Sequence, residues 1–292
     1  MGQRAPLAAG GAGRFAVRWL LSALFFLAIA VSFAFVVLPV VAIFFHVPLG
    51  RLLHEFSNPV VTDALGVSLR SVAISQVVIL ALGTPTAYFL ASRRFFGRSL
   101  AITLVELPIV LPPAVAGIGL LVAFGRFGLL GSTFQWLGVD VSFNQTAVVF
   151  AITLVSGPFY IRQAIAAFES VDANLVAASR TLGASPLRTF FRVTVPLARP
   201  GLAAGEAICL ARGLGEFGAT IMFAGSLQGR TQTLPLAIYT VFEAQNGLPV
   251  ALAISALLVI VSLAILLSLK LTTRWQPSPQ TSLSLSGRFG SS

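Results

Sequence analysis

The chain has 292 residues, of which 57% are hydrophobic and only 10% charged, and its mean hydropathy is +0.93. This composition is far more apolar than that of a soluble domain, so most of the chain is expected to contact membrane lipid. The net charge of +10 raises the question of nucleic acid, but the basic residues cluster in alternate loops, which indicates membrane topology and no nucleic-acid partner. The single cysteine, Cys209, excludes an intrachain disulfide and a thiolate metal cluster.

Six apolar stretches are each long enough to cross a bilayer, for which about 20 helical residues suffice. In chain order they cover residues 19–45, 72–91, 100–124, 141–161, 202–223 and 250–269. Backbone amides in lipid need partners within their own segment, and the period-2 alternation of a membrane barrel is not present. We therefore expect an all-α integral membrane protein with six transmembrane helices.

The distribution of arginines predicts which loops face the cytoplasm. Arg93, Arg94 and Arg98 follow the second stretch, and five more arginines lie between the fourth and fifth stretches. By the positive-inside rule, both termini are then cytoplasmic. We expect a cytoplasmic tail over residues 1–18, a membrane domain over 19–270, and a disordered cytoplasmic tail over 271–292, where the sequence becomes rich in serine.

The longest cytoplasmic loop, residues 169–198, has the pattern of two short amphipathic helices. Ser170 or Asp172 can cap the start of the first helix, and Gly183 is placed to end it. Ser185, followed by proline, predicts the N-cap of the second helix, which Pro196 should end.

The second helix of this loop combines aromatic and basic side chains. Phe190 and Phe191 supply apolar surface, and Arg188 and Arg192 lie one turn apart. Such a helix suits the apolar cleft of a partner protein, but it also suits a surface of anionic lipid. The residue pattern alone leaves these two interpretations open.

The stretch "AASRTLGASPLRTFFRVTVP", residues 177–196, resembles the EAA loop of the permeases of bacterial ABC transporters. The pattern of that loop is Glu-Ala-Ala, three residues, Gly, and about a dozen residues to a Leu-Pro pair. The matching positions are Ala178, Gly183 and Pro196. The departures are Ala177 for the glutamate, Ser179 for the second alanine and Val195 for the leucine.

The resemblance implies the permease fold of a type I ABC importer and a coupling helix that docks on a separate ATPase subunit. The residues that it assigns to this contact are Ala177, Ala178, Gly183, Ser185, Arg188, Phe190, Phe191, Arg192 and Pro196. The sequence has no Gly-x-x-x-x-Gly-Lys-Ser/Thr motif, so we expect no cofactor in this chain, with ATP and magnesium bound by the ATPase. The chain is thus expected to be a permease subunit and no enzyme itself.

A second stretch, "ARGLGEFGATIMFAGSLQGRTQTLPLAIY" at residues 211–239, resembles the molybdate permeases and, in its Gly-Glu-Phe-Gly portion, the related sulfate permeases. This resemblance implies import of molybdate or tungstate through the bacterial inner membrane, from a periplasmic binding protein. It also implies a homodimer with two ATPase subunits. A sulfate or thiosulfate importer is the alternative substrate assignment. An intramembrane enzyme or a receptor is the alternative class, although no catalytic constellation is visible.

Ionisable residues and glycines in the fifth stretch are candidates for the transport pathway. Arg212 and Glu216 lie four residues apart, so they either form an ion pair within the bundle or place Arg212 beside the path of an anion. Gly213, Gly215 and Gly218 formally match Gly-x-Gly-x-x-Gly, but no strand precedes them. These glycines predict either a bend beside the pathway or close helix packing.

The third stretch contains "ELPIVLPPAVAGIG", in which prolines interrupt an apolar helix. Glu106, Pro108, Pro112 and Pro113 mark it as a pathway or gate element, with simple structural kinking as the alternative. His46 and other nearby residues lack the ligand spacing of a metal site, so we predict no metal and no catalytic residue.

Overall fold

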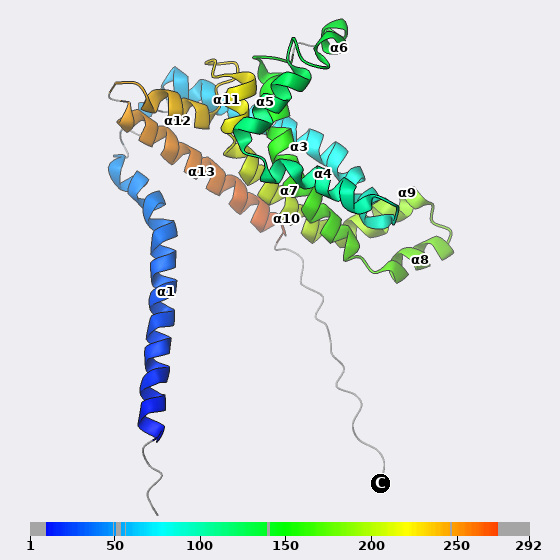
Figure 1. The fold of residues 1–292 in the computed structure, drawn as a ribbon, viewed down its shortest axis with the longest axis horizontal. Coiled ribbons are helices and arrows are strands. Elements are labelled where there is room, and N and C mark those ends of the chain that lie inside the picture. Colours follow the sequence, from blue (N-terminus) through cyan, green and yellow to red (C-terminus); the bar gives the residue numbers. More distant parts are fainter. Residues whose placement is uncertain are drawn as a thin grey trace, which may run out of the picture.

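The computed structural model describes residues 10–48, 50, 54, 55, 57–138, 141–245 and 247–273, and the regular structure in them is helical (Figure 1). The elements are α1 (Gly10–His46), α3 (Pro59–Ser92), α4 (Arg98–Val110), α5 (Pro113–Phe124), α6 (Gly131–Trp136), α7 (Gln145–Glu169), α8 (Ala173–Thr181), α9 (Pro186–Thr189), the π-helical turn η1 (Phe190–Thr194), α10 (Val195–Leu214), α11 (Gly218–Ala224), α12 (Leu234–Phe242) and α13 (Leu248–Thr273). The all-α prediction is confirmed.

Among the described residues, four helices are long and apolar enough to cross a membrane: α1, α3, α7 and α13. Two further helix pairs reach the required length only together. The pair α4 and α5 is bent by 114°, and the segment Pro186–Leu214 is bent by 58° relative to α11. The number of spans is therefore between four and six, and each predicted stretch overlaps one long helix or one bent pair.

Helix α7 forms the centre of the bundle, packed between α3 and α10. Small residues permit this close packing. A Cβ atom built at Gly83 of α3 would lie 3.1 Å from the ring of Tyr160 on α7, and one at Gly205 of α10 would lie 2.9 Å from Gln163 Cβ. Tyr160 is fully buried, and its hydroxyl shares a 2.7 Å hydrogen bond with the hydroxyl of Thr84 on α3. The three helices thus make one closely packed unit.

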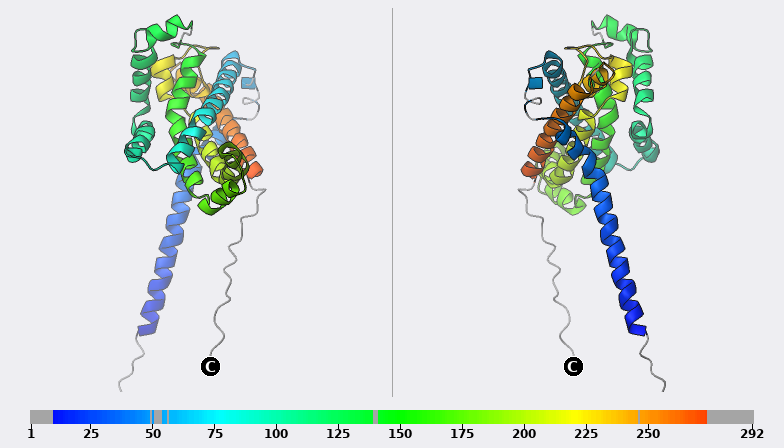
Figure 2. Two further views of the ribbon diagram at one scale, coloured as in Figure 1. Left: turned by 90° about the vertical axis from the view of Figure 1, so that its right-hand side faces the viewer. Right: turned by 90° about the vertical axis from the view of Figure 1, so that its left-hand side faces the viewer.

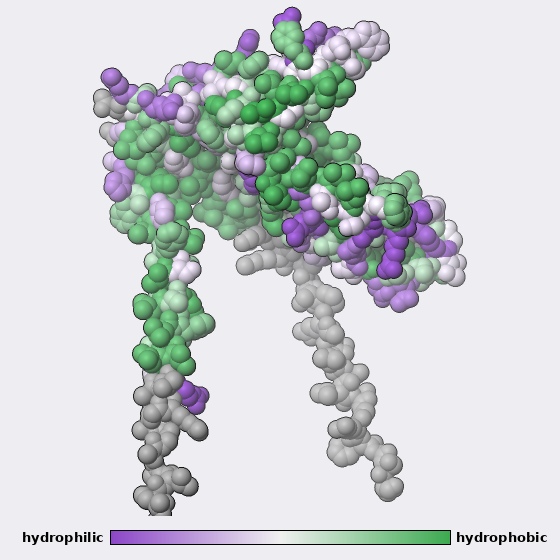
Figure 3. Space-filling view, in the orientation of Figure 1, coloured by the Kyte–Doolittle hydropathy of each residue, from purple (hydrophilic) through white to green (hydrophobic). Residues whose placement is uncertain are grey.

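Helix α1 differs from the others because no residue of its most apolar 18-residue window is buried. It extends away from the bundle, and the C-terminal part of α1 packs on α13 (Figures 1 and 2). Large apolar side chains such as Phe33 and Phe35 are more than two-thirds exposed. Hydrophobic side chains also cover much of the surface of the bundle (Figure 3), as expected for a surface in contact with lipid.

Several predicted boundaries need correction. Helix α1 begins at Gly10, within the segment expected to be a tail, and α13 continues to Thr273. Arg162 lies inside α7 instead of in the loop that follows. The rest of the expected C-terminal tail, residues 274–292, lies outside the described residues.

The prediction that Pro196 ends the second loop helix is wrong. That helix continues from α9 through η1 into α10 without a break. In η1 the N–H of Val195 donates to the carbonyl of Phe190, five residues earlier. Pro196 follows directly in the first turn of α10. A proline is tolerated there because the wider π-helical turn relieves the clash of its ring with the preceding turn.

Candidate functional site

The two bent helix pairs meet at their breaks. Pro112 caps the N-terminus of α5 and Pro113 is its first residue, while the break between α10 and α11 lies at residues 215–217. A Cβ atom at Gly218 would lie 2.8 Å from Pro113 Cβ, and one at Gly117 would lie 2.6 Å from the carbonyl oxygen of Ala219. Glycines thus allow α5 and α11 to touch backbone to backbone. The structure therefore brings together two candidate regions that are about 100 residues apart in the sequence.

Arg212 and Glu216 form an ion pair at the break between α10 and α11. Their Nη2 and Oε2 atoms are 2.7 Å apart, and the Glu216 side chain is 1% exposed whereas that of Arg212 is 28% exposed. Glu216 Oε1 also accepts a 2.7 Å hydrogen bond from the N–H of Ala219 in the first turn of α11. The carboxylate thus balances the arginine and satisfies a free N–H at a helix start. Arg212 keeps an accessible face beside the break.

The glycines of this stretch have different surroundings. Gly213 packs on α7, since a Cβ atom there would lie 3.1 Å from Ile152 Cγ2. Gly215 ends α10, and a Cβ atom there would meet nothing closer than 3.9 Å. Of the two predicted roles, close helix packing occurs at Gly213 and the break in the helix occurs at Gly215.

Buried polar side chains of α3 and α7 face α10, a feature that the sequence analysis missed. A Cβ atom at Gly213 would lie 3.5 Å from Ser156 Oγ and 3.6 Å from Gln76 Nε2. Gln76 is 6% exposed, and the hydroxyl of the neighbouring Ser75 donates to the carbonyl of Val149 on α7. The available signal was the polar pair Ser75 and Gln76 inside the second apolar stretch, because such residues in lipid mark helix contacts.

Helix α4 carries two of the predicted pathway residues. Glu106 Oε1 lies 3.4 Å from Arg162 Nε on α7, and both side chains are partly exposed. Arg98, at the start of α4, pairs with Glu169 at the end of α7. Pro108 lies inside α4, facing α3 and α7, where it borders an apolar pocket of about 310 Å³. Two ion pairs therefore hold α4 against α7.

The predicted helix starts in residues 169–198, called the coupling segment after the contact that the resemblance implies, are confirmed. Asp172, one of the two proposed caps, accepts a 2.8 Å hydrogen bond from the N–H of Asn174 at the start of α8. Gly183 has φ +82° after α8, a conformation that side chains with a Cβ rarely adopt. Ser185 Oγ accepts from the N–H of Arg188 and caps α9. Ala177 and Ala178 are exposed on α8.

The structure separates the two phenylalanines of this segment. Phe190 faces inward, with its ring 4.7 Å from that of Tyr88 on α3, whereas Phe191 is 61% exposed. Arg188 and Arg192 are also exposed. Ser179, one of the departures from the EAA pattern, hydrogen-bonds through its hydroxyl to that of buried Thr189 and joins α8 to α9. Of the two rings, only Phe191 is thus available to a partner.

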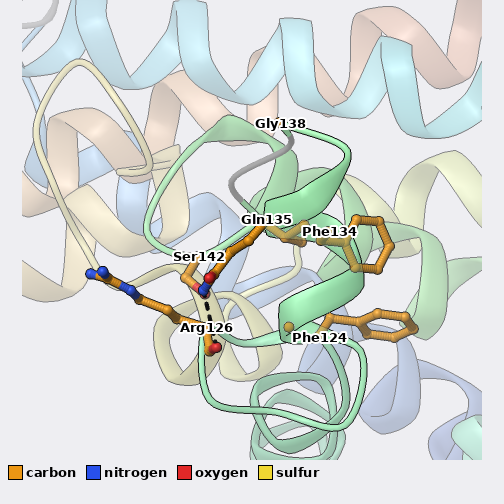
Figure 4. Close-up of a pocket in the computed structure, with 8 residues that line it drawn as sticks. Phe124, Arg126, Phe134, Gln135, Gly138 and Ser142 are labelled. Atoms are coloured by element: carbon orange, nitrogen blue, oxygen red, sulfur yellow. Dashed lines mark hydrogen bonds between the residues drawn. The ribbon is translucent and has the colours of Figure 1, made fainter.

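A pocket of about 420 Å³ lies at the end of the molecule near α6, opposite to α8 (Figures 1 and 4). It combines the rings of Phe124 and Phe134, 5.8 Å apart, with polar side chains. Gln135 Nε2 donates to the carbonyl of Arg126, and the Arg126 guanidinium extends away from the two rings (Figure 4). The described residues contain no group of three or more His, Cys, Asp or Glu side chains that could hold a metal ion.

Residues 83–276 match the family of binding-protein-dependent transport system inner membrane components. The match covers more than half of the chain, so the chain belongs to this family of integral membrane permease components. This confirms the resemblance to ABC-transporter permeases. Within this family, the chain is a permease subunit of a transport system and no enzyme itself, since ATP is hydrolysed by a separate subunit.

The relatives with the most extensive matches include molybdenum transport proteins. The chain is 43% identical to the molybdenum transport system permease protein ModB of Mycobacterium tuberculosis, over 80% of this chain and 88% of that protein. It is 38% identical to the ModB protein of Escherichia coli K12, over 73% and 92%.

Solved structures share the fold at lower sequence identity. One is a bacterial alginate ABC transporter in complex with an alginate-bound periplasmic protein, with a TM-score of 0.73 at 17% identity over 90% of this chain and 96% of that chain. Another is the methionine ABC transporter MetNI in an inward-facing conformation, with a TM-score of 0.58 at 19% identity over 74% and 95%. These likenesses establish the fold of an ABC importer permease.

Proposed function

We propose that the chain is the transmembrane permease subunit of an ATP-driven importer that carries molybdate, and tungstate as a similar tetrahedral dianion, from a periplasmic binding protein to the cytoplasm. The observation that carries this proposal is the 43% identity to a molybdenum permease over 80% of the chain. The identity extends over the membrane helices as well as the coupling segment. The same relative therefore supports both the proposed substrate and the proposed role as a permease.

The exposed coupling segment supports the proposed contact with an ATPase subunit. Its first helix presents Ala177 and Ala178, small residues that allow close approach, and Phe191 in η1 offers an exposed aromatic anchor. The αL turn at Gly183 and the hydrogen bond between the hydroxyls of Ser179 and Thr189 connect the two helices. A push on α8 would therefore be transmitted through η1 into α10, which carries Arg212 at its far end.

We further propose that the chain crosses the inner membrane of a bacterium six times and that both of its termini lie in the cytoplasm. The start of α1, the end of α13 and the coupling segment lie toward the same side in Figures 1 and 2, which supports this topology. One chain carries one coupling segment, so a motor with two ATPase subunits requires two copies about a two-fold axis. The meeting point of α5 and α11 is our candidate for the pathway between those copies.

Uptake of radiolabelled molybdate into proteoliposomes tests the proposal. The vesicles contain this chain, its cognate ATPase and the binding protein, and vesicles without the binding protein are the matched control. ATP-dependent uptake that excess tungstate blocks and excess sulfate leaves intact is the expected result. Uptake that sulfate abolishes would reject the substrate assignment, and uptake without ATP would reject the mechanism.

A further inference from the structure

Two adjoining pockets lie between α3 and the coupling segment. The first, of about 600 Å³, lies between the end of α3, the start of α4, the end of α7 and α8. The second, of about 590 Å³, lies between the end of α3 and α9 with η1. Tyr88, Ser92 and Arg180 border both pockets. The coupling segment therefore does not close completely onto the membrane helices but leaves a divided groove.

The walls of this groove carry a surplus of positive charge. Arg94 and Arg98 line the first pocket, Arg93 lines the second, and Arg180 lies between them. The only carboxylate among the lining residues is Glu169, which is paired with Arg98. In the part of the chain that the structure describes, the other three arginines form no ion pair. Asp172, close by in sequence, uses its carboxylate to cap α8.

The second pocket is amphipathic along its length. Arg93 and Arg180 supply its positive charge, while Pro85, Leu187, Phe190 and Phe191 provide an apolar wall. Pro85 precedes Arg93 by eight residues on α3 and its C-cap, so it lies about 12 Å further into the proposed membrane. The wall is well ordered by packing, since the Phe190 ring contacts both Tyr88 and Phe191 at centroid distances of 4.7 and 5.0 Å.

We propose that this groove binds an anionic phospholipid of the cytoplasmic leaflet. Its phosphate lies between Arg93 and Arg180, and an acyl chain covers the apolar wall at Pro85 and Leu187, which leaves the exposed ring of Phe191 to the ATPase. Guanidinium groups match phosphate geometry, and basic pockets between helices at the cytoplasmic surface suit lipid headgroups. A free anion would leave the apolar wall uncovered, so the amphipathic profile selects a lipid. Figure 3 shows hydrophilic surface over α8 next to hydrophobic surface, as this position at the membrane boundary requires.

The bound lipid would join two parts of the molecule. Arg93 follows α3 in the membrane domain, whereas Arg180 belongs to α8 of the coupling segment. A phosphate shared by both would hold α8 against the bundle while leaving Ala177, Ala178 and the outer face of the segment free. The site goes beyond the proposed transport function and depends only on the proposed orientation of the coupling segment toward the cytoplasm.

Native mass spectrometry of the full chain in detergent, titrated with phosphatidylglycerol, phosphatidylcholine or inorganic phosphate, tests the proposal. The double variant Arg93→Gln, Arg180→Gln removes the two phosphate contacts. The matched control is Arg199→Gln, an exposed arginine of α10 that lines neither pocket. We expect phosphatidylglycerol affinity to fall about fivefold for each arginine and about thirtyfold for both. The control should keep the affinity, and phosphatidylcholine should bind weakly to every variant.

Any one of four results would overturn the proposal. Unchanged phosphatidylglycerol affinity in the double variant would place the lipid elsewhere, and an equal loss in the Arg199→Gln control would indicate a general effect of surface charge. Inorganic phosphate that binds as tightly as the lipid would make this a site for a free anion. A further measurement needs no variant: affinity of the unaltered chain for phosphatidylglycerol must fall as salt is raised, and a salt-independent affinity would also reject the site.

Discussion

The contact between α5 and α11 gives the most direct test of the proposed site. Gly117 lies where a Cβ atom would be 2.6 Å from the carbonyl oxygen of Ala219 and 2.8 Å from Met222 Cβ. The backbone oxygen cannot rotate away, so Gly117→Ala must push the two helices apart. Overpacking of this kind costs about 1–3 kcal/mol. Gly119, two residues later on α5, has open space at the same position and supplies the control.

Both variants gain the helix propensity of alanine, about 1 kcal/mol, so the difference between them isolates the steric effect. We expect Gly117→Ala to unfold roughly 2–12 °C below Gly119→Ala in a thermal scan in detergent, from 2–4 °C for each kcal/mol. Reconstituted molybdate uptake should fall in Gly117→Ala and stay normal in Gly119→Ala. Equal unfolding temperatures of the two variants would refute the close contact. Equal uptake despite a lower unfolding temperature of Gly117→Ala would show that transport does not need this contact.

The remaining predictions concern the coupling segment and the ion pair. Gly183→Pro should abolish co-purification of the ATPase while membrane insertion is retained, because proline cannot adopt φ +82°. Gly183→Asn should keep the complex, since asparagine tolerates this conformation. Equal binding of the ATPase by both variants would argue against the coupling role. Phe191→Ala should weaken ATPase binding with little change in unfolding temperature, because this ring is exposed. Phe190→Ala should lower the free energy of unfolding by about 2 kcal/mol, roughly half the cost of a fully buried phenylalanine. The reverse pattern would refute the assignment of Phe190 as the inward ring and Phe191 as the outward ring. Arg212→Ala leaves the buried Glu216 carboxylate unpaired and should cost about 3 kcal/mol, measured as a loss of thermal stability. The pair Arg212→Ala, Glu216→Gln should regain most of that stability; restored uptake in this double variant would limit Arg212 to a structural role, and continued loss would place it beside the anion.

The comparison between sequence and structure is clearest in the coupling segment. Local signals predicted the cap at Asp172, the turn at Gly183 and the cap at Ser185, because each depends on the conformation of a few neighbouring residues. The continuation of the helix past Pro196 was mispredicted. Phe190 of the π-helical turn there packs against Tyr88, which lies about 100 residues earlier in the chain and so outside any local pattern.

The candidate pathway shows the same limit. Sequence spacing indicated an Arg212–Glu216 pair and prolines that interrupt the third apolar stretch, since both are short-range properties. It could not indicate that the break after α4 packs against the break after α10. Nor did it assign a role to Gln76, whose burial follows from the crossing of α3, α7 and α10.

The sequence by itself determined the membrane environment, the helical class, the positions of the apolar stretches and the coupling motif, because composition, hydropathy and short motifs act locally. Only the tertiary structure decided the 114° bend between α4 and α5, the meeting of the two broken helices, and the different exposure of Phe190 and Phe191. Close approach between distant helices is possible only where glycines face one another in three dimensions, and that pairing is not encoded in the spacing along the chain.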